Sequence, residues 1–293
     1  MAIIPPFFMD AVVALGVELP DNKKHWVGTG FLVGRKEQDN PDLSTVYIIT
    51  NKHVVRNQRQ LYVRFSNNGA VGVKDLPMPL VNKENAKIYS EHPFPNVDIV
   101  AIQIVPQVIL DNNLSLNFFV LDDHSLMLNQ MQSTGVDEGS LVYALGFPMN
   151  LVDNSVKAPL CRLGCISRVA DAFVNPQSAA TFLVDAQTFP GNSGGPIVSR
   201  PELISIDGTP KNTSANLIGI LSAYIPYRET LYSRQTGRDR MIQEENSGLT
   251  IVHPVDRIKE VVELEWKRIE QQKAVSNAAS LPAPQEAKEE VAV

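Results

Sequence analysis

The sequence is poor in cysteine, in long apolar runs and in positive charge, and each scarcity excludes a class of protein. Only two of its 293 residues are cysteines, which excludes a scaffold stapled by disulfides. No run approaches the roughly 18 consecutive apolar residues of a membrane-spanning helix, so we expect no membrane partner. The formal net charge is −6, so we also expect no nucleic-acid partner.

The start of the chain and its cysteines favour a cytoplasmic location. The apolar residues 3–9 have no basic residue before them and include Pro5 and Pro6, whereas a secretory signal needs a positive start. Cys161 and Cys165 are four positions apart, too far to bridge along a strand. We expect two reduced thiols. No cluster of potential ligands has metal-binding spacing, so neither a metal nor a cofactor is expected.

Short apolar, β-branched runs separated by polar turns dominate the chain up to residue 253. Helical periodicity is almost absent there, which predicts an all-β protein built from antiparallel barrels or sandwiches. The polar segment Tyr227–Ser247 is interpreted as a long surface loop between two strands. The expected strands are Ala11–Leu19, Trp26–Val33, Thr45–Thr50, Gln60–Phe65, Ile99–Val105, Leu141–Leu145, Cys165–Val169, Thr181–Val184, Ile197–Val198 and Leu217–Ala223.

The pattern changes to that of an amphipathic helix over residues 254–275. One helical face collects the apolar residues Ile258, Val261, Val262, Trp266 and Ile269. Packing of this face on its own domain is the simplest interpretation, and docking of a protein partner through the helix and tail is the alternative. Residues 276–293 are rich in Ala, Pro and Glu and lack aromatics, which predicts a disordered tail.

The most informative segment is Phe-Pro-Gly-Asn-Ser-Gly-Gly-Pro at residues 189–196. Glycine and proline around Ser193 predict a tight turn. Such a turn can also aim successive backbone N–H groups into one anion-binding concavity. A nucleophilic serine needs such donors for the oxyanion that it creates, and the amides of Gly191 and Ser193 are the natural pair. Taken alone, the segment fits a structural turn and a catalytic turn equally well.

The same residues also match the G-x-S-x-G nucleophile elbow of α/β-hydrolases. That elbow leads into a helix, and its acid and histidine follow the serine in the chain. Here Gly194, Gly195 and Pro196 lead into another apolar strand, and His253 is the only histidine downstream. The elbow interpretation is therefore rejected, and a general base has to lie upstream.

Two upstream residues complete a triad in the order His, Asp, Ser. His53 follows the expected strand Thr45–Thr50 and precedes two valines, although a histidine in such a place is more often structural. Asp98 lies among β-branched residues, where a buried carboxylate needs hydrogen-bond partners and an imidazole can supply one. Asp98 also fits a strand-start aspartate that is satisfied by backbone amides. The chain order is that of chymotrypsin-type enzymes, and it differs from the orders in subtilisin and α/β-hydrolases.

On these residues the sequence resembles the trypsin-like (chymotrypsin-fold) serine endopeptidases, particularly the bacterial HtrA/Deg-like branch. The resemblance covers about residues 11–255. Its pieces are weak singly but stand in register: Gly28–Val33, Ile49–Val55, Val97–Ala101, Ala144–Pro148, Asp185–Ala186, Pro190–Pro196 and Leu217–Ser222.

The resemblance implies two six-stranded antiparallel β-barrels with the active site between them. The N-terminal barrel, residues 1–125, would carry His53 and Asp98, and the C-terminal barrel, residues 126–253, would carry Ser193. The implied activity is hydrolysis of peptide bonds in protein or peptide substrates. Ser193 would attack the carbonyl, His53 would carry its proton, and Asp98 would orient His53. The substrate contacts implied by alignment are Gln187, Thr188, Ser222, Ala223 and Tyr224, with Ser222–Tyr224 pairing with the substrate backbone.

Departures from the family pattern modify these expectations. Asn192 stands where digestive relatives carry an acidic residue, so activation by propeptide cleavage is not expected. About 40 residues follow Pro254, too few for the PDZ module of HtrA proteins. Gln187 replaces the acidic residue that selects Lys or Arg, so we expect a small or medium uncharged side chain before the cleaved bond. The alternative functions are a catalytically silent binding module of the same fold and an effector subunit that a partner activates.

Overall fold

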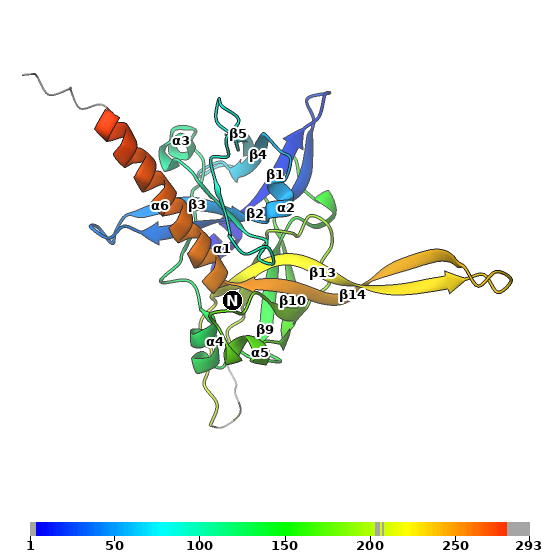
Figure 1. The fold of residues 1–293 in the computed structure, drawn as a ribbon. Coiled ribbons are helices and arrows are strands. Elements are labelled where there is room, and N and C mark those ends of the chain that lie inside the picture. Colours follow the sequence, from blue (N-terminus) through cyan, green and yellow to red (C-terminus); the bar gives the residue numbers. More distant parts are fainter. Residues whose placement is uncertain (1–3, 203–205, 207, 280–293) are drawn as a thin grey trace, which may run out of the picture.

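The computed structural model describes residues 4–202, 206 and 208–279, and its strands form two sheets that pack against each other (Figure 1). The mostly-β, chymotrypsin-like fold with a C-terminal helix confirms the predicted class. The short helices are α1 (Pro6–Asp10), α2 (Lys52–Val55), α3 (Pro106–Asp111), α4 (Leu128–Thr134), η1 (Pro148–Asn150) and α5 (Ala170–Val174).

The N-terminal sheet has eight strands, whereas the family resemblance implied a six-stranded barrel. Along its main path the order is β5-β4-β1-β2-β3-β7-β6, and β8 pairs in parallel with β2. Pro77 and Pro79 in edge strand β5 have no N–H to donate to a further neighbour. Among the described strands, β5 and β6 stand at opposite ends of the path and do not pair, so this sheet is not closed. Its strands are β1 (Val12–Glu18), β2 (Lys24–Lys36), β3 (Ser44–Thr50), β4 (Gln60–Ser66), β5 (Val73–Pro79), β6 (Ser90–Glu91), β7 (Val100–Gln103) and β8 (Phe119–Val120).

The C-terminal sheet is a closed six-stranded barrel, as predicted. Its order is β10-β11-β14-β13-β12-β9 around the barrel. The strands are β9 (Leu141–Gly146), β10 (Leu160–Arg168), β11 (Phe182–Asp185), β12 (Pro196–Ser199), β13 (Leu217–Tyr232) and β14 (Asp239–Pro254).

The predicted surface loop at Tyr227–Ser247 is wrong, because most of this segment forms the outer part of a long β13–β14 hairpin. Tyr227 pairs with Glu245, and Leu231 pairs with Met241. The hairpin projects far from the barrel (Figure 1). Both of its faces meet solvent, so its sequence lacks the alternation of apolar and polar residues that reveals a half-buried strand.

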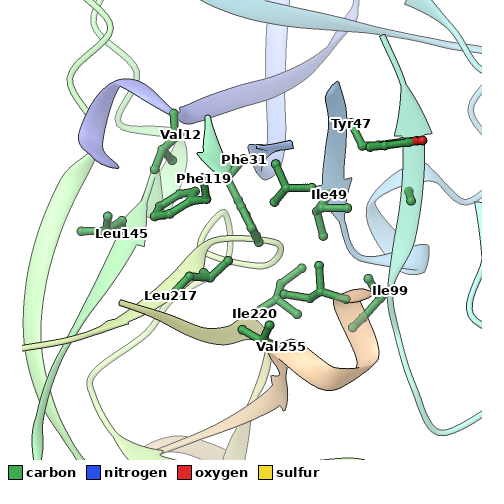
Figure 2. Close-up of a cluster of buried hydrophobic side chains, with 14 of the residues drawn as sticks. Val12, Phe31, Tyr47, Ile49, Ile99, Phe119, Leu145, Leu217, Ile220 and Val255 are labelled. Atoms are coloured by element: carbon green, nitrogen blue, oxygen red, sulfur yellow. The ribbon is translucent and has the colours of Figure 1, made fainter. Parts of the chain in front are cut away.

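One continuous core joins the two sheets, because successive residues of β1 and β3 point to opposite faces. Val13 and Ile48 point into the core of the N-terminal sheet. Val12 and Ile49 instead join a cluster that also contains residues of the C-terminal barrel and of helix α6 (Figure 2). The cluster includes Phe31, Tyr47, Phe119, Leu145, Leu217, Ile220 and Val255. The two sheets are thereby held in a fixed relation.

Helix α6 (Val255–Ala279) packs on this core, which confirms the simplest interpretation of its apolar face. Val255, Ile258, Val261 and Val262 are buried, and Trp266 lies against them. The helix extends four residues beyond the predicted range, so residues 276–279 are helical, although they were predicted as tail. Residues 280–293 of the predicted tail lie outside the described residues. Among the described helices, none is both long and apolar enough to cross a membrane.

Lys157 is a buried cation in the segment before β10. Its Nζ donates to the carbonyl oxygen of Asp10. Burial lowers the pKa of Lys157 from 10.5 to about 8, since the charged form loses hydration inside the protein. An unfolded lysine keeps its proton up to about pH 10. Unfolding therefore takes up protons between these values, and the stability of the folded protein rises with pH across that window.

Replacing Lys157 by Met should remove this pH dependence. Relative to the variant, the wild-type protein should gain free energy of unfolding between pH 8 and 10, at up to about 1.4 kcal/mol per pH unit. Urea denaturation of both proteins at pH 7, 8, 9 and 10 measures the difference. Lys23→Met is the matched control, because the Lys23 side chain is 79% exposed. Equal slopes for wild type and Lys157→Met would contradict the assignment.

Candidate active site

Strand pairing brings His53 and Asp98 together. His53 lies in α2, directly after β3, and Asp98 lies just before β7. Thr50 at the end of β3 pairs with Val100 at the start of β7. The chain segments that leave this pair therefore carry the two side chains to the same end of the sheet.

The imidazole of His53 is held by the carboxylate of Asp98. His53 Nδ1 lies 2.5 Å from Asp98 Oδ2, and the His53 backbone N–H donates to Oδ1 at 3.2 Å. The Ser222 hydroxyl donates to Oδ2 at 3.3 Å. A carboxylate beside Nδ1 places the ring proton there, and Nε2 of the neutral ring is then an acceptor.

The local environment keeps Asp98 ionised. Burial by itself raises the pKa of the Asp98 carboxyl, but the hydrogen bonds and the charge interaction from His53 outweigh burial. The pKa of Asp98 therefore lies below its ordinary value of 3.8. A carboxylate that stays negative at neutral pH can stabilise positive charge on His53.

The backbone of Asp98 is also fixed on both sides. Asn51 Nδ2 donates to the Asp98 carbonyl at 2.7 Å. The Asp98 N–H donates to His253 Nε2 at 3.0 Å, while His253 Nδ1 donates to the carbonyl of Ala180 at 2.8 Å. His253 belongs to β14, so the C-terminal barrel holds the acid of the N-terminal sheet.

Thr29 of β2 holds the turn that contains Ser193. Its backbone N–H donates to the Ser193 carbonyl at 2.9 Å, and its hydroxyl donates to the Gly191 carbonyl at 2.6 Å. Gly194 lies so close to β2 that a Cβ there would be 2.1 Å from the Thr29 carbonyl oxygen, and its φ is +85°. Only glycine fits at this position without displacing the strand.

The same turn leaves two neighbouring amides free. The Pro190 carbonyl accepts from the Met149 N–H at 2.6 Å, and the Asn192 carbonyl accepts from the Gly195 N–H at 2.9 Å. Both carbonyls are thus engaged by other amides. Within the described residues, neither the Gly191 N–H nor the Ser193 N–H donates a hydrogen bond. Free amides beside a serine hydroxyl are the donors that an oxyanion needs.

The Ser193 hydroxyl donates to the Ser222 carbonyl at 3.2 Å. Among the described residues no hydrogen bond joins it to His53. Both side chains nevertheless line one open cavity of about 370 Å³. Three segments far apart in the chain therefore meet at the same depression.

The cavity wall is mostly apolar and carries no carboxylate. It is lined by His53, Thr188, Phe189, Pro190, Ser193, Leu221, Ser222, Ala223 and Tyr224. Four of the five predicted substrate contacts are among these residues. Gln187 is not, because the chain alternates here: Ala186 and Thr188 are buried, whereas Gln187 is exposed. In the described part of the chain no group of acidic residues, histidines and cysteines is placed to hold a metal ion.

Comparison with known proteins identifies the family. A family model described as a trypsin-like peptidase domain matches residues 28–202, which is more than half of the chain. The chain belongs to this family. The trypsin-like peptidase match includes His53, Asp98 and Ser193, and it ends before the β13–β14 hairpin and α6.

The other comparisons add little to the assignment. A solved structure titled "Structure of GrC" is 16% identical to the chain and has a TM-score of 0.42. The alignment covers 92% of this chain and 97% of the other chain. No curated protein matches the sequence.

Sequence reasoning missed several residues around the candidate site. Thr29 and Asn51 lie inside two of the segments that carry the family resemblance. The sequence of these segments does not indicate that Thr29 bonds to Gly191 or that Asn51 bonds to Asp98. His253 was considered only as a possible base after the serine. A histidine at the end of an apolar strand signals a buried imidazole, yet its contact with Asp98 depends on how two sheets dock.

The buried His253 should make stability fall in acid. Burial lowers the pKa of His253 below its ordinary value of 6.5. The unfolded chain therefore binds a proton below about pH 6.5 that the folded protein resists, and stability is lost as pH falls. His253→Gln keeps an acceptor for the Asp98 N–H but cannot titrate. Its free energy of unfolding should decrease less than that of the wild type between pH 7 and 5.

Urea denaturation at several pH values measures this difference. His25→Gln is the control, because His25 is exposed and its replacement should leave the wild-type profile in place. A His253→Gln profile that is parallel to that of the wild type would show that His253 does not contribute.

Proposed function

We propose that the protein is a serine endopeptidase in which Ser193 is the nucleophile. The observation that carries the proposal is the meeting of an Asp98-held imidazole and the Ser193 hydroxyl at one cavity, next to the free amides of Gly191 and Ser193. His53 would be the general base, Asp98 would fix and compensate it, and the two amides would form the oxyanion hole.

The reaction would begin with a rotation of the Ser193 side chain. The hydroxyl would leave the Ser222 carbonyl and donate instead to His53 Nε2, a contact that commonly tightens only when substrate binds. Ser193 Oγ then bonds to the peptide carbonyl carbon as its proton passes to Nε2. The carbonyl oxygen becomes negative and accepts hydrogen bonds from the Gly191 and Ser193 amides.

The same groups would complete turnover. Protonated His53 gives its proton to the leaving amine as the carbon–nitrogen bond breaks, which leaves an acyl group on Ser193. Water then attacks this ester, with His53 again taking the proton and afterwards returning it to Ser193 Oγ. Asp98 remains ionised throughout, in agreement with its lowered pKa.

The substrate would bind in extended form along Ser222–Tyr224. Its backbone would add to this strand, and the side chain before the cleaved bond would enter the cavity beside Thr188. The wall has no carboxylate to pair with Lys or Arg. We therefore propose a small or medium uncharged side chain at that position.

A second candidate is a binding module or an effector subunit that a partner activates. The observation that favours it is the hydrogen bond from Ser193 to Ser222 in place of one to His53.

Two further features bear on the subfamily and the location. Asn192 in place of an acidic residue supports a position near the HtrA/Deg-like branch. The free thiols of Cys161 and Cys165 suit a cytoplasmic location.

Fluorophosphonate labelling tests the catalytic proposal. The wild-type protein should gain a single adduct, which peptide mapping places on Ser193. Ser193→Ala should remove the label and lower peptide hydrolysis by about 10³-fold or more. Ser178→Ala is the control, since Ser178 is an exposed serine outside the cavity. An unlabelled but folded wild-type protein would favour the second candidate.

A panel of peptides that vary only in the residue before the cleaved bond tests the proposed specificity. Uncharged side chains should give the highest kcat/KM, since a charged side chain would lose hydration in a cavity without a countercharge. Arg and Lys should be cleaved at least about 10-fold more slowly. Fastest cleavage after Arg would contradict the proposed specificity.

A further inference from the structure

The hairpin beyond the cavity continues the strand that the proposed function assigns to substrate. We call residues 225–247 the arm. β13 contains Ser222–Tyr224 at the cavity and runs on to Tyr232 in the arm. The arm projects into solvent away from both sheets (Figure 1). It lies beyond residue 202, where the family match ends.

One edge of β13 is open from the cavity outwards. β12 pairs with β13 only at its beginning, where Pro196 lies opposite Ile220. β14 covers the other edge as far as the pair Tyr232–Asp239. Among the described residues no further strand pairs with β13 beyond Ile220. An unpaired strand edge is a template for the addition of another extended chain. Pro226 is the one residue of β13 beyond Ile220 without an N–H, so an added chain forms no hydrogen bond to the nitrogen of that residue.

This open edge begins at the proposed nucleophile. The Ser222 carbonyl accepts the Ser193 hydroxyl at 3.2 Å. β13 runs from the cavity toward the end of the arm. A chain that pairs antiparallel with it therefore has its N-terminal end toward the end of the arm and its C-terminal end at the cavity. The residues that precede the cleaved bond extend toward Tyr232, ten positions beyond Ser222. At about 3.3 Å per residue, these ten positions of β13 offer about 33 Å of edge.

The surface of the arm is unusual for a solvated hairpin. Two strands without a third are marginally stable in water. The arm nevertheless exposes large apolar side chains, with Tyr232 65%, Ile242 60%, Met241 56%, Tyr227 54% and Leu231 45% exposed. These side chains lie on both faces of the arm, where they are available to contact a bound chain.

The end of the arm is basic. Arg234, Arg238 and Arg240 lie at or beside the turn, and none forms an ion pair with another described residue. Closer to the barrel, Arg228 is paired with Glu244 at 2.7 Å. Unpaired guanidinium groups at this place would attract carboxylates on the bound chain.

We propose that the arm extends the substrate-binding strand and holds an unfolded polypeptide segment of about ten residues that precedes the cleaved bond. Segments with acidic residues near the arginine-rich end are preferred. This inference rests on the proposed function and adds its substrate class: long, extended polypeptides rather than short peptides. Pairing of two arms from two copies of the chain is the competing use of the same edge.

The test compares a long and a short substrate in an arm-shortened protein. The variant joins Tyr227 to Glu245, which are cross-strand partners, through Asn-Gly, a two-residue turn suited to a hairpin. The long peptide has twelve residues before the cleaved bond, with Asp at the first three, and the short peptide keeps only the last four. Wild type should cleave the long peptide with at least a 10-fold higher kcat/KM. The shortened protein should lose this advantage through KM, with short-peptide turnover and labelling unchanged.

A triple substitution tests the charged end without altering the hairpin. Arg234, Arg238 and Arg240 are each changed to Gln, and the long peptide is compared with a copy that carries Asn for Asp. The wild type should prefer the acidic peptide about 5-fold or more, and the variant should not. An unchanged long-to-short ratio in the shortened protein would overturn the proposal, whatever the triple variant does.

Two further measurements separate the other outcomes. Binding of the long peptide to Ser193→Ala, with and without the arm, gives Kd values that need no catalysis. If the wild type takes no fluorophosphonate label, the proposed function fails. In that case a Kd that is about 10-fold higher without the arm than with it would still support the arm as a binding edge. Equal Kd values with and without the arm would refute it. Sedimentation that shows a dimer only with the arm present, together with a Kd ratio near 1, would assign the edge to a second copy.

Discussion

The hydrogen bonds from Thr29 to the turn that contains Ser193 are the contacts on which the site depends. A single buried residue of β2 donates to the carbonyls of Gly191 and Ser193, and its hydroxyl accepts from the Phe147 N–H. These bonds hold the turn against the N-terminal sheet, while the Met149 and Gly195 amides engage the Pro190 and Asn192 carbonyls and leave the Gly191 and Ser193 N–H groups unengaged. The shape of the turn is therefore set by how the two sheets dock, and the core shared between them fixes that docking.

The half-buried charge of Asp98 also depends on contacts from both sheets. A carboxylate that is partly removed from water needs hydrogen-bond donors to replace its lost hydration. His53 and Ser222 supply donors to its oxygens, whereas Asn51 and His253 bind its backbone. These partners come from both sheets, so displacing one sheet would expose the charge and release the imidazole together. Stability and site geometry are thus coupled through one residue.

Sequence reasoning identified the parts of the structure that short-range patterns encode. Apolar runs located ten of the described strands but missed β5, β6, β8 and β14. The glycine turn and the order of residues 53, 98 and 193 located the candidate site. The contacts between the two sheets could not be predicted in this way. The sequence around Thr29 or His253 does not indicate a hydrogen-bond partner that lies more than a hundred residues away in the chain. The outer part of the β13–β14 hairpin, residues 227–247, was predicted to be a loop, because a strand with solvent on both faces has no alternating pattern. Gln187 was carried over by alignment, although local alternation turns it outward.

A crystal structure with a bound peptide aldehyde tests most directly whether Ser193 and the two amides act as proposed. The aldehyde forms a stable adduct that has the geometry of the tetrahedral intermediate. The account predicts a covalent bond from Ser193 Oγ to the aldehyde carbon, with the hemiacetal oxygen about 2.7–3.1 Å from both the Gly191 and the Ser193 amide nitrogens. His53 Nε2 would then lie within hydrogen-bond reach of the adduct. An adduct on another residue, or an oxygen that neither amide contacts, would contradict the account.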